Sequence, residues 1–331
     1  MSESVSNTRP ISILAGYMIT AITLTATCIS IILRKKPVAG DASSRRPVIP
    51  FAALAAVSLA TTWYYMFCYF RWSYLDWAST QPLHDSTDLR LGQWLRDTSL
   101  FKQAWASTVR TPLRTWWSLQ IFGFCAIWSI ILAVQAKRRG IPHAWVFMLL
   151  GQIVAISFAA NLSFIAFTIY DDALPQGHDR HVIESSEGKA GKNEREPSPT
   201  SSSSLTTFWW PLILGINMAC AICIPNSFGS WHFMSLLLVP HVLAFAPMLL
   251  TTFQSSPNSL ELPPVSLQIW CIASFSIIAI IQAVSTGGDL RRVLDTLYEH
   301  PAVSSVGWDV ICCWVSFTAW GVFSSRRRDF D

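Results

Sequence analysis

The residues best suited to chemistry are acids placed inside or beside long apolar runs. Asp309 lies within the run 306–314, Asp97 lies in the segment 84–120 and Asp76 follows the run 48–70. An ionisable group at bilayer depth costs roughly 2.5–3.5 kcal/mol on insertion scales, so it suggests a function. A carboxyl group in an apolar site can stay protonated and donate its proton. Asp309 is therefore the first candidate acid, Asp97 the second, and Asp76 a partner for Asp97.

A structural role stays open for each acid. Asp309 falls about one turn inside its apolar run, where the positive end of a helix dipole favours a carboxylate. Helical spacing places Asp309, Cys313, Ser316 and Trp320 on one face, which predicts that this face points into a helix bundle.

Aromatic and polar side chains that could line a cavity form the second group. The chain has 16 Trp and 19 Phe among 331 residues. Aromatic rings can shelter a cation, although tryptophan also anchors helices at membrane surfaces. Amides and histidines inside a membrane often only join helices by hydrogen bonds. The candidate binding residues are Trp94, Trp105, Trp116, Trp117, Asn161 and His241.

Several chemistries lack their motifs. The predicted spans contain no lysine for a retinal Schiff base, and the seven histidines form no repeated metal-binding boxes. The sequence has no Walker loop, no GxSxG and no aspartate-rich motif for magnesium diphosphate. We therefore predict chemistry without a metal or a cofactor.

The composition is that of an integral membrane protein. Hydrophobic residues make up 51% of the chain and charged residues 13%, against roughly 25% charged in soluble domains. The net charge is only +4, and the basic residues stand in short runs beside apolar segments, so nucleic acid is a poor candidate partner. The expected partner is the lipid bilayer, and the expected location is the endoplasmic reticulum membrane.

The hydropathy pattern predicts an all-α, polytopic bundle with about eight transmembrane spans in a single domain. The predicted spans cover about 11–33, 48–70, 116–135, 144–169, 208–224, 232–253, 267–284 and 304–323. Basic residues in short loops favour an N-terminus outside, with ten inside against four on the outer termini. This topology puts Asp76 and Glu299 on opposite sides of the membrane. The basic residues 326–328 in the C-terminal tail conflict with this topology, because it places them outside. If the segment at 208–224 or at 267–284 does not cross the membrane, the conflict disappears, and every later segment changes sides.

Two segments between the spans have their own character. Residues 84–113 predict an amphipathic helix on the lumenal surface, with Leu91, Trp94, Phe101, Trp105 and Val109 on one stripe. Such a helix could act as a lid between its neighbouring spans. Residues 175–207 are rich in serine, proline and charge, which predicts a disordered loop.

Several phrases together carry a family resemblance. They are LFKQAW at 100–105, RTWWSLQ at 114–120, IPHAW at 141–145, GQIVAISFA at 151–159 and HPAVSSVGWDV at 300–310. In these the chain resembles fungal integral membrane terpene cyclases of meroterpenoid biosynthesis, of the ascofuranone-cyclase type. The resemblance implies acid-initiated cyclisation of an epoxidised prenyl chain, without a metal, on a prenylated substrate. It matches no catalytic acid of the family residue by residue.

A transporter or a binding protein of secondary metabolism, with no catalytic activity, is the alternative. The same interior polar residues could hold a solute. The lack of a visible internal repeat and of broken helix pairs in the sequence argues against transport.

Overall fold

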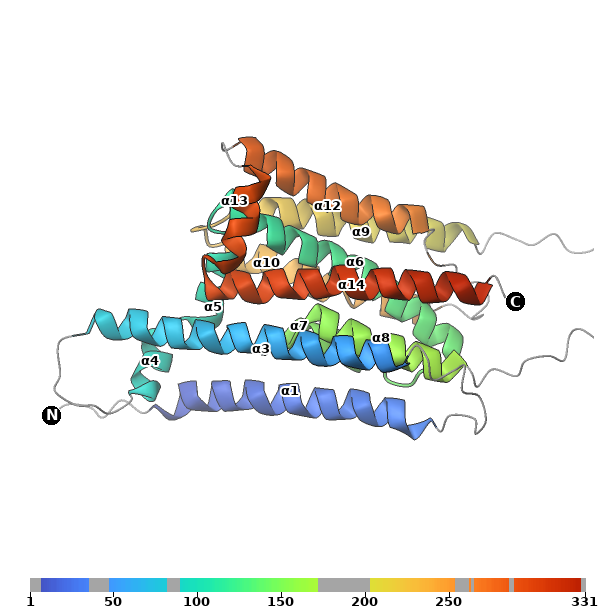
Figure 1. The fold of residues 1–331 in the computed structure, drawn as a ribbon, viewed down its shortest axis with the longest axis horizontal. Coiled ribbons are helices and arrows are strands. Elements are labelled where there is room, and N and C mark those ends of the chain that lie inside the picture. The colour runs from blue at the N-terminus through green and yellow to red at the C-terminus, as the bar shows by residue number, and fades with distance from the viewer. Residues whose placement is uncertain are drawn as a thin grey trace, which may run out of the picture.

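A computed structural model describes residues 7–35, 48–81, 90–171, 203–253, 262, 265–285 and 289–328. These residues form a bundle of helices, with no strand among them, which confirms the predicted fold class. Figure 1 shows the long helices side by side along the length of the molecule. The helices are α1 (Thr8–Arg34), α3 (Val48–Ser79), α4 (Leu91–Asp97), α5 (Leu100–Val109), α6 (Pro112–Arg139), α7 (Trp145–Ile153), α8 (Ile156–Asp171), α9 (Ser203–Asn226), α10 (Phe233–Leu243), α11 (Ala246–Thr252), α12 (Val265–Ser285), α13 (Leu290–Asp295), the 3-10 helix η2 (Thr296–Tyr298) and α14 (Pro301–Arg328).

Six helical segments are long and apolar enough to cross a bilayer, so the chain is an integral membrane protein. They are α1, α3, α6, α9, α10 with α11, and α14. The described apolar part of α12 is shorter, but this helix has 21 residues and packs along α6, so we count it as a crossing. We name the two ends of the bundle after α1: the Thr8 end, at the left of Figure 1, and the Arg34 end, at its right.

Helix α6 is the axis of the bundle. Every residue from Trp117 to Ala136 is buried. The helix begins with Thr111, whose side chain accepts a hydrogen bond from the Arg114 N–H, and it ends at Gly140 in the left-handed conformation (φ 62°). Helix α6 packs against α5, α8, α9, α11, α12 and α14, so most of the bundle is arranged around it.

The segment 144–169 does not cross the membrane, which corrects its prediction as a span. It folds into a hairpin in which α7 enters from the Arg34 end and α8 returns to it. At the far end of α8, Tyr170 donates a hydrogen bond to the carbonyl of Ile31 (3.2 Å), and Arg139 donates one to the carbonyl of Phe167 (3.1 Å). The start of α8 instead lies against the middle part of α14, near Asp309. An irregular backbone at this depth is tolerated because protein surrounds it.

This hairpin reduces the predicted eight crossings to seven and inverts everything that follows it. The α14 C-terminus therefore lies at the Arg34 end (Figure 1), on the same side as the basic run 137–139, which removes the conflict posed by the basic tail. The prediction that Glu299 and Asp76 lie on opposite sides is wrong. Glu299 forms a salt bridge with Arg114 (2.8 Å) at the Thr8 end, the end at which the α3 helix carrying Asp76 finishes.

The predicted surface helix at 84–113 consists of two short helices, α4 and α5, at the Thr8 end. The first ends at Thr98, whose extended backbone (ψ 141°) breaks the helix. The break separates the predicted stripe: Trp94 and Val109 are buried, whereas Leu91 and Phe101 are exposed. Residues 82–89 lie outside the described residues. So does most of the loop predicted to be disordered, up to residue 202, while residues 203–207 belong to α9.

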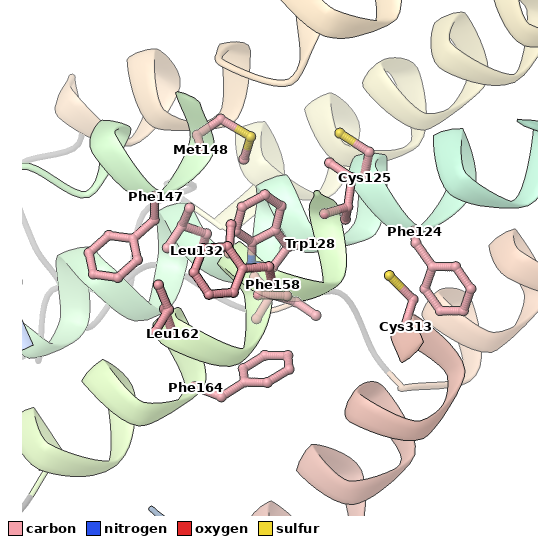
Figure 2. Packing of buried hydrophobic residues seen from close by; sticks show 14 of the residues in the cluster. Phe124, Cys125, Trp128, Leu132, Phe147, Met148, Phe158, Leu162, Phe164 and Cys313 are labelled. Atoms are coloured by element: carbon pink, nitrogen blue, oxygen red, sulfur yellow. The ribbon is translucent and has the colours of Figure 1, made fainter. Parts of the chain in front are cut away.

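Gly151 lets the hairpin pack closely on α6. A Cβ added there would lie 2.6 Å from the indole of Trp128, a fully buried ring that donates a hydrogen bond to Ser163 (3.1 Å). Figure 2 shows this ring enclosed by Phe158, Met148 and Leu132.

We therefore expect Gly151→Ala to lower the free energy of unfolding by roughly 1–3 kcal/mol, because an overpacked rigid ring has no room to move. Denaturation with sodium dodecyl sulfate in mixed micelles measures this. Gly321→Ala is the control, since nothing lies within 4 Å of an added Cβ there. Equal unfolding midpoints for the two variants would contradict the expected close packing.

Candidate functional site

Asp309 caps a neighbouring helix inside the bundle. Its side chain is 6% exposed, and its two oxygens accept the backbone N–H groups of Ile156 (3.0 Å) and Ser157 (2.8 Å). These are among the first N–H groups of α8, which have no partner within their own helix. A carboxylate at this position also interacts favourably with the helix dipole. Asp309 therefore has the structural role that the sequence left open, but the helix whose N-terminus it stabilises is α8 instead of its own helix.

Asn161 continues the polar line between α8 and α14. Its amide nitrogen donates to the carbonyl of Ser157 (2.9 Å) and to the hydroxyl of Ser316 (2.8 Å). One turn further, Trp320 stacks on Phe164 with ring centroids 4.9 Å apart. Asp309, Ser316 and Trp320 thus share the face predicted from their spacing. Asn161 joins two helices here, the usual role of an amide inside a membrane.

Asp97 and Asp76 lie apart from Asp309, at the Thr8 end. Asp97 accepts hydrogen bonds from Arg96 (2.9 Å) and from the indole of Trp77 (3.3 Å), and its side chain is 35% exposed. The hydrogen bond from Arg96 is the main reason why the pKa of Asp97 is lowered. Asp97 is thus an ionised surface acid and a poor proton donor. Asp76 is exposed on α3, and no contact links it to Asp97 within the described residues.

Trp94 and Trp117 serve as buried hydrogen-bond donors. The indole of Trp94 donates to Ser73 (3.2 Å) and that of Trp117 donates to Thr296 (3.2 Å). Trp116 packs edge to face on Trp117 with centroids 4.6 Å apart, and its own indole N–H is buried without a partner. These contacts hold α4 against α3 and η2 against α6.

Trp105 and His241, predicted separately, do come together. The Trp105 ring on α5 stacks on Phe122 of α6 (5.9 Å, 15° between planes). The imidazole of His241 on α10 stands nearly perpendicular to both rings, 5.5 Å from the first and 5.9 Å from the second. Trp116 packs against the same buried cluster. We call Trp105, Trp116, Phe122 and His241 the aromatic site.

The protonation of His241 follows from its backbone contact. Its Nδ1 lies 2.8 Å from the carbonyl of Leu237, which can only accept, so Nδ1 carries the hydrogen. In the neutral imidazole the other ring nitrogen, Nε2, therefore keeps its lone pair. The aromatic site thus combines π faces with one basic nitrogen, at a depth within the span Phe233–Thr252.

Phe122, Glu299 and His300 were not among the predicted site residues. Phe122 is one of many apolar residues in its run, and nothing in the sequence distinguishes it. His300 lies directly before Pro301, a common start of a helix, and this was the available signal that it would lie at a structured helix end.

No group of three or more His, Cys, Asp or Glu in the described part of the chain is close enough to hold a metal.

Comparison with known families gives one match. Residues 265–331, about a fifth of the chain, match a family described as "Protein of unknown function DUF2834". No curated protein and no solved structure matches the chain.

Proposed function

We propose that this protein is a membrane-bound terpene cyclase that closes an epoxidised prenyl chain of a meroterpenoid or related terpenoid by acid-initiated cyclisation. The observation that carries the proposal is the aromatic site, where stacked Trp105 and Phe122 rings meet the unprotonated nitrogen of His241 within a membrane span. Cyclisation passes through a carbocation, which π faces stabilise. It ends when a weak base removes a proton.

The roles within the aromatic site follow from this chemistry. Trp105 and Phe122 face the cation, and Nε2 of His241 receives the final proton. Asp309 and Asp97 are poor choices for the initiating acid, because each carboxylate already accepts hydrogen bonds on both oxygens. The proton that opens the epoxide therefore comes from another donor.

A transporter is the second candidate, and the α7–α8 hairpin favours it, since broken helices inside a membrane often bind solutes. Here, however, the free N–H groups at the break bind Asp309 instead of facing a cavity. Cyclisation therefore remains our first proposal.

The experiment is an assay in microsomes, because the endoplasmic reticulum is the proposed location. An epoxyfarnesyl phenol should give a cyclised isomer of unchanged mass. We expect His241→Phe to reduce the rate roughly 10²-fold, the lower range for loss of a general base, and Trp105→Leu to reduce it as well. His232→Phe, at an exposed histidine, is the matched control and should keep the rate of the wild type.

One outcome would count against the cyclase, and another would count against its proposed site. Substrate taken up only by sealed vesicles, with no new product, would support a transporter. Product formed at the wild-type rate by His241→Phe would remove the aromatic site from the reaction.

A further inference from the structure

His300 is a buried histidine outside the aromatic site. It precedes α14, is 7% exposed, and accepts the backbone N–H of Ala302 on its Nδ1 (3.2 Å). A nitrogen that accepts carries no hydrogen, so the neutral ring bears its hydrogen on Nε2. This N–H is buried and has no hydrogen-bond partner. A buried donor without an acceptor costs about 1–3 kcal/mol, so the site calls for an acceptor atom that the protein itself does not supply.

Charges of both signs act on His300. Arg114 is paired with Glu299 at 2.8 Å, and the more distant Arg110 and Asp76 act on the imidazole in opposite directions. Burial and Arg114 keep the ring neutral by lowering its pKa to about 4. Each charge near His300 is therefore paired with another charge or opposed by one, so the surroundings supply no counter-ion for a charged ligand.

Two aromatic rings wall the imidazole. Trp72 lies edge to face with it at 4.4 Å between centroids, and Tyr69 lies at 6.0 Å. Trp72 is 39% exposed, so the aromatic wall beside His300 borders the surroundings of the bundle. These aromatic rings favour a ligand whose acceptor atom is attached to an apolar group.

More hydrogen-bonding atoms without a partner lie along the contact between α3 and α14. Ser305 donates to the carbonyl of Thr62 (3.3 Å), which brings the two helices together one turn beyond His300. The hydroxyl of Thr62 and the indole N–H of Trp308 are both buried without partners. Trp308 lies three residues after Ser305, on the same face of α14. The α3–α14 contact therefore presents several hydrogen-bonding groups that the protein leaves unused.

We propose that the α3–α14 contact at the Thr8 end is a binding site for an uncharged, lipophilic molecule whose oxygen accepts the Nε2–H of His300. A ketone, an aldehyde, an ether or an epoxide has this chemistry. The site is separate from the aromatic site, and its occupation is measured as binding, without any turnover. Failure of this proposal therefore leaves the proposed cyclase activity untouched.

The test compares two probes that differ in one oxygen. Geranylacetone, a terpenoid ketone, is measured against the hydrocarbon in which a methylene replaces its carbonyl, by equilibrium binding to the full chain in nanodiscs with empty nanodiscs subtracted. We expect the wild type to bind the ketone roughly tenfold more tightly, the size of one buried hydrogen bond. His300→Phe keeps the ring packing on Trp72 but removes the donor, so it should bind both probes equally. His300→Gln restores an N–H and should restore part of the preference.

The controls keep the proposal open to refutation. His232→Phe, at an exposed histidine of the same end, should keep the tenfold preference. Thermal unfolding of each variant shows that it is folded. Equal binding of both probes by the wild type would overturn the proposal and leave the N–H to water or to the π face of Trp72. A tenfold preference retained in His300→Phe would place the acceptor elsewhere.

Discussion

Asp309→Leu should lower the free energy of unfolding by roughly 2–6 kcal/mol, because it leaves two buried N–H groups without acceptors at about 1–3 kcal/mol each. Both groups belong to buried residues, Ile156 and Ser157, inside the bundle. Asp309→Asn keeps one acceptor oxygen and should lose about half as much. Denaturation by sodium dodecyl sulfate in mixed micelles measures both variants.

The matched control is Asp295→Asn, an exposed acid at the end of α13, which should leave stability unchanged. An unfolding midpoint of Asp309→Leu equal to that of the wild type would contradict the capping role.

The same variants separate capping from catalysis. If Asp309 only caps α8, the folded fraction of Asp309→Asn should cyclise substrate at the wild-type rate. If the carboxyl were the initiating acid, as the sequence first suggested, the rate would fall far more than the folded fraction does. The hydrogen bonds on both carboxylate oxygens favour the first result.

The long crossings were predictable because a span is a local property. A helix needs about 20 apolar residues to cross the hydrocarbon core of a bilayer, and α1, α6 and α14 are long enough. The inward face of α14 was predictable for a similar reason, since helical spacing alone aligns Asp309 with Ser316 and Trp320.

The hairpin was not predictable, because the apolar run 144–169 satisfies hydropathy whether it crosses or returns. The break between α7 and α8 contains no proline or glycine: its residues are Val154 and Ala155. What stabilises it is Asp309, some 150 residues further along the chain. Because the return of α8 was not predicted, every later segment, including Glu299, was assigned to the wrong side of the membrane.

The candidate sites depend on contacts that the sequence does not contain. Trp105, Phe122 and His241 come from three helices, and only the packing of α5 and α10 on α6 brings them together. Asp97 was the second candidate acid because it lies in the segment 84–120, which was predicted to carry an apolar stripe. The stripe is divided at Thr98, so the carboxylate faces outward and pairs with Arg96.

The stability of the wild type should fall as the pH drops from about 6.5 toward about 4, and His300 is the cause. Burial, followed by the charge of Arg114, lowers the pKa of this imidazole from 6.5 to about 4 in the folded state. Between these two values the unfolded chain binds a proton that the folded chain does not, so acid favours unfolding. The full shift corresponds to roughly 3 kcal/mol.

The pH range for this measurement is set by Glu299. The hydrogen bond from Arg114 lowers the pKa of Glu299 from its usual 4.5, so this acid stabilises the folded state above about pH 4.5 and loses that effect as the pH falls further. The slope of unfolding free energy between pH 6.5 and 4.5 therefore excludes most of the contribution of Glu299. In this range His300→Phe, which cannot take up a proton, should have a smaller slope than the wild type, as measured by denaturation at a series of pH values. Identical slopes would mean that His300 accepts a proton without cost, and hence that it is hydrated, in conflict with its burial between Tyr69 and Trp72.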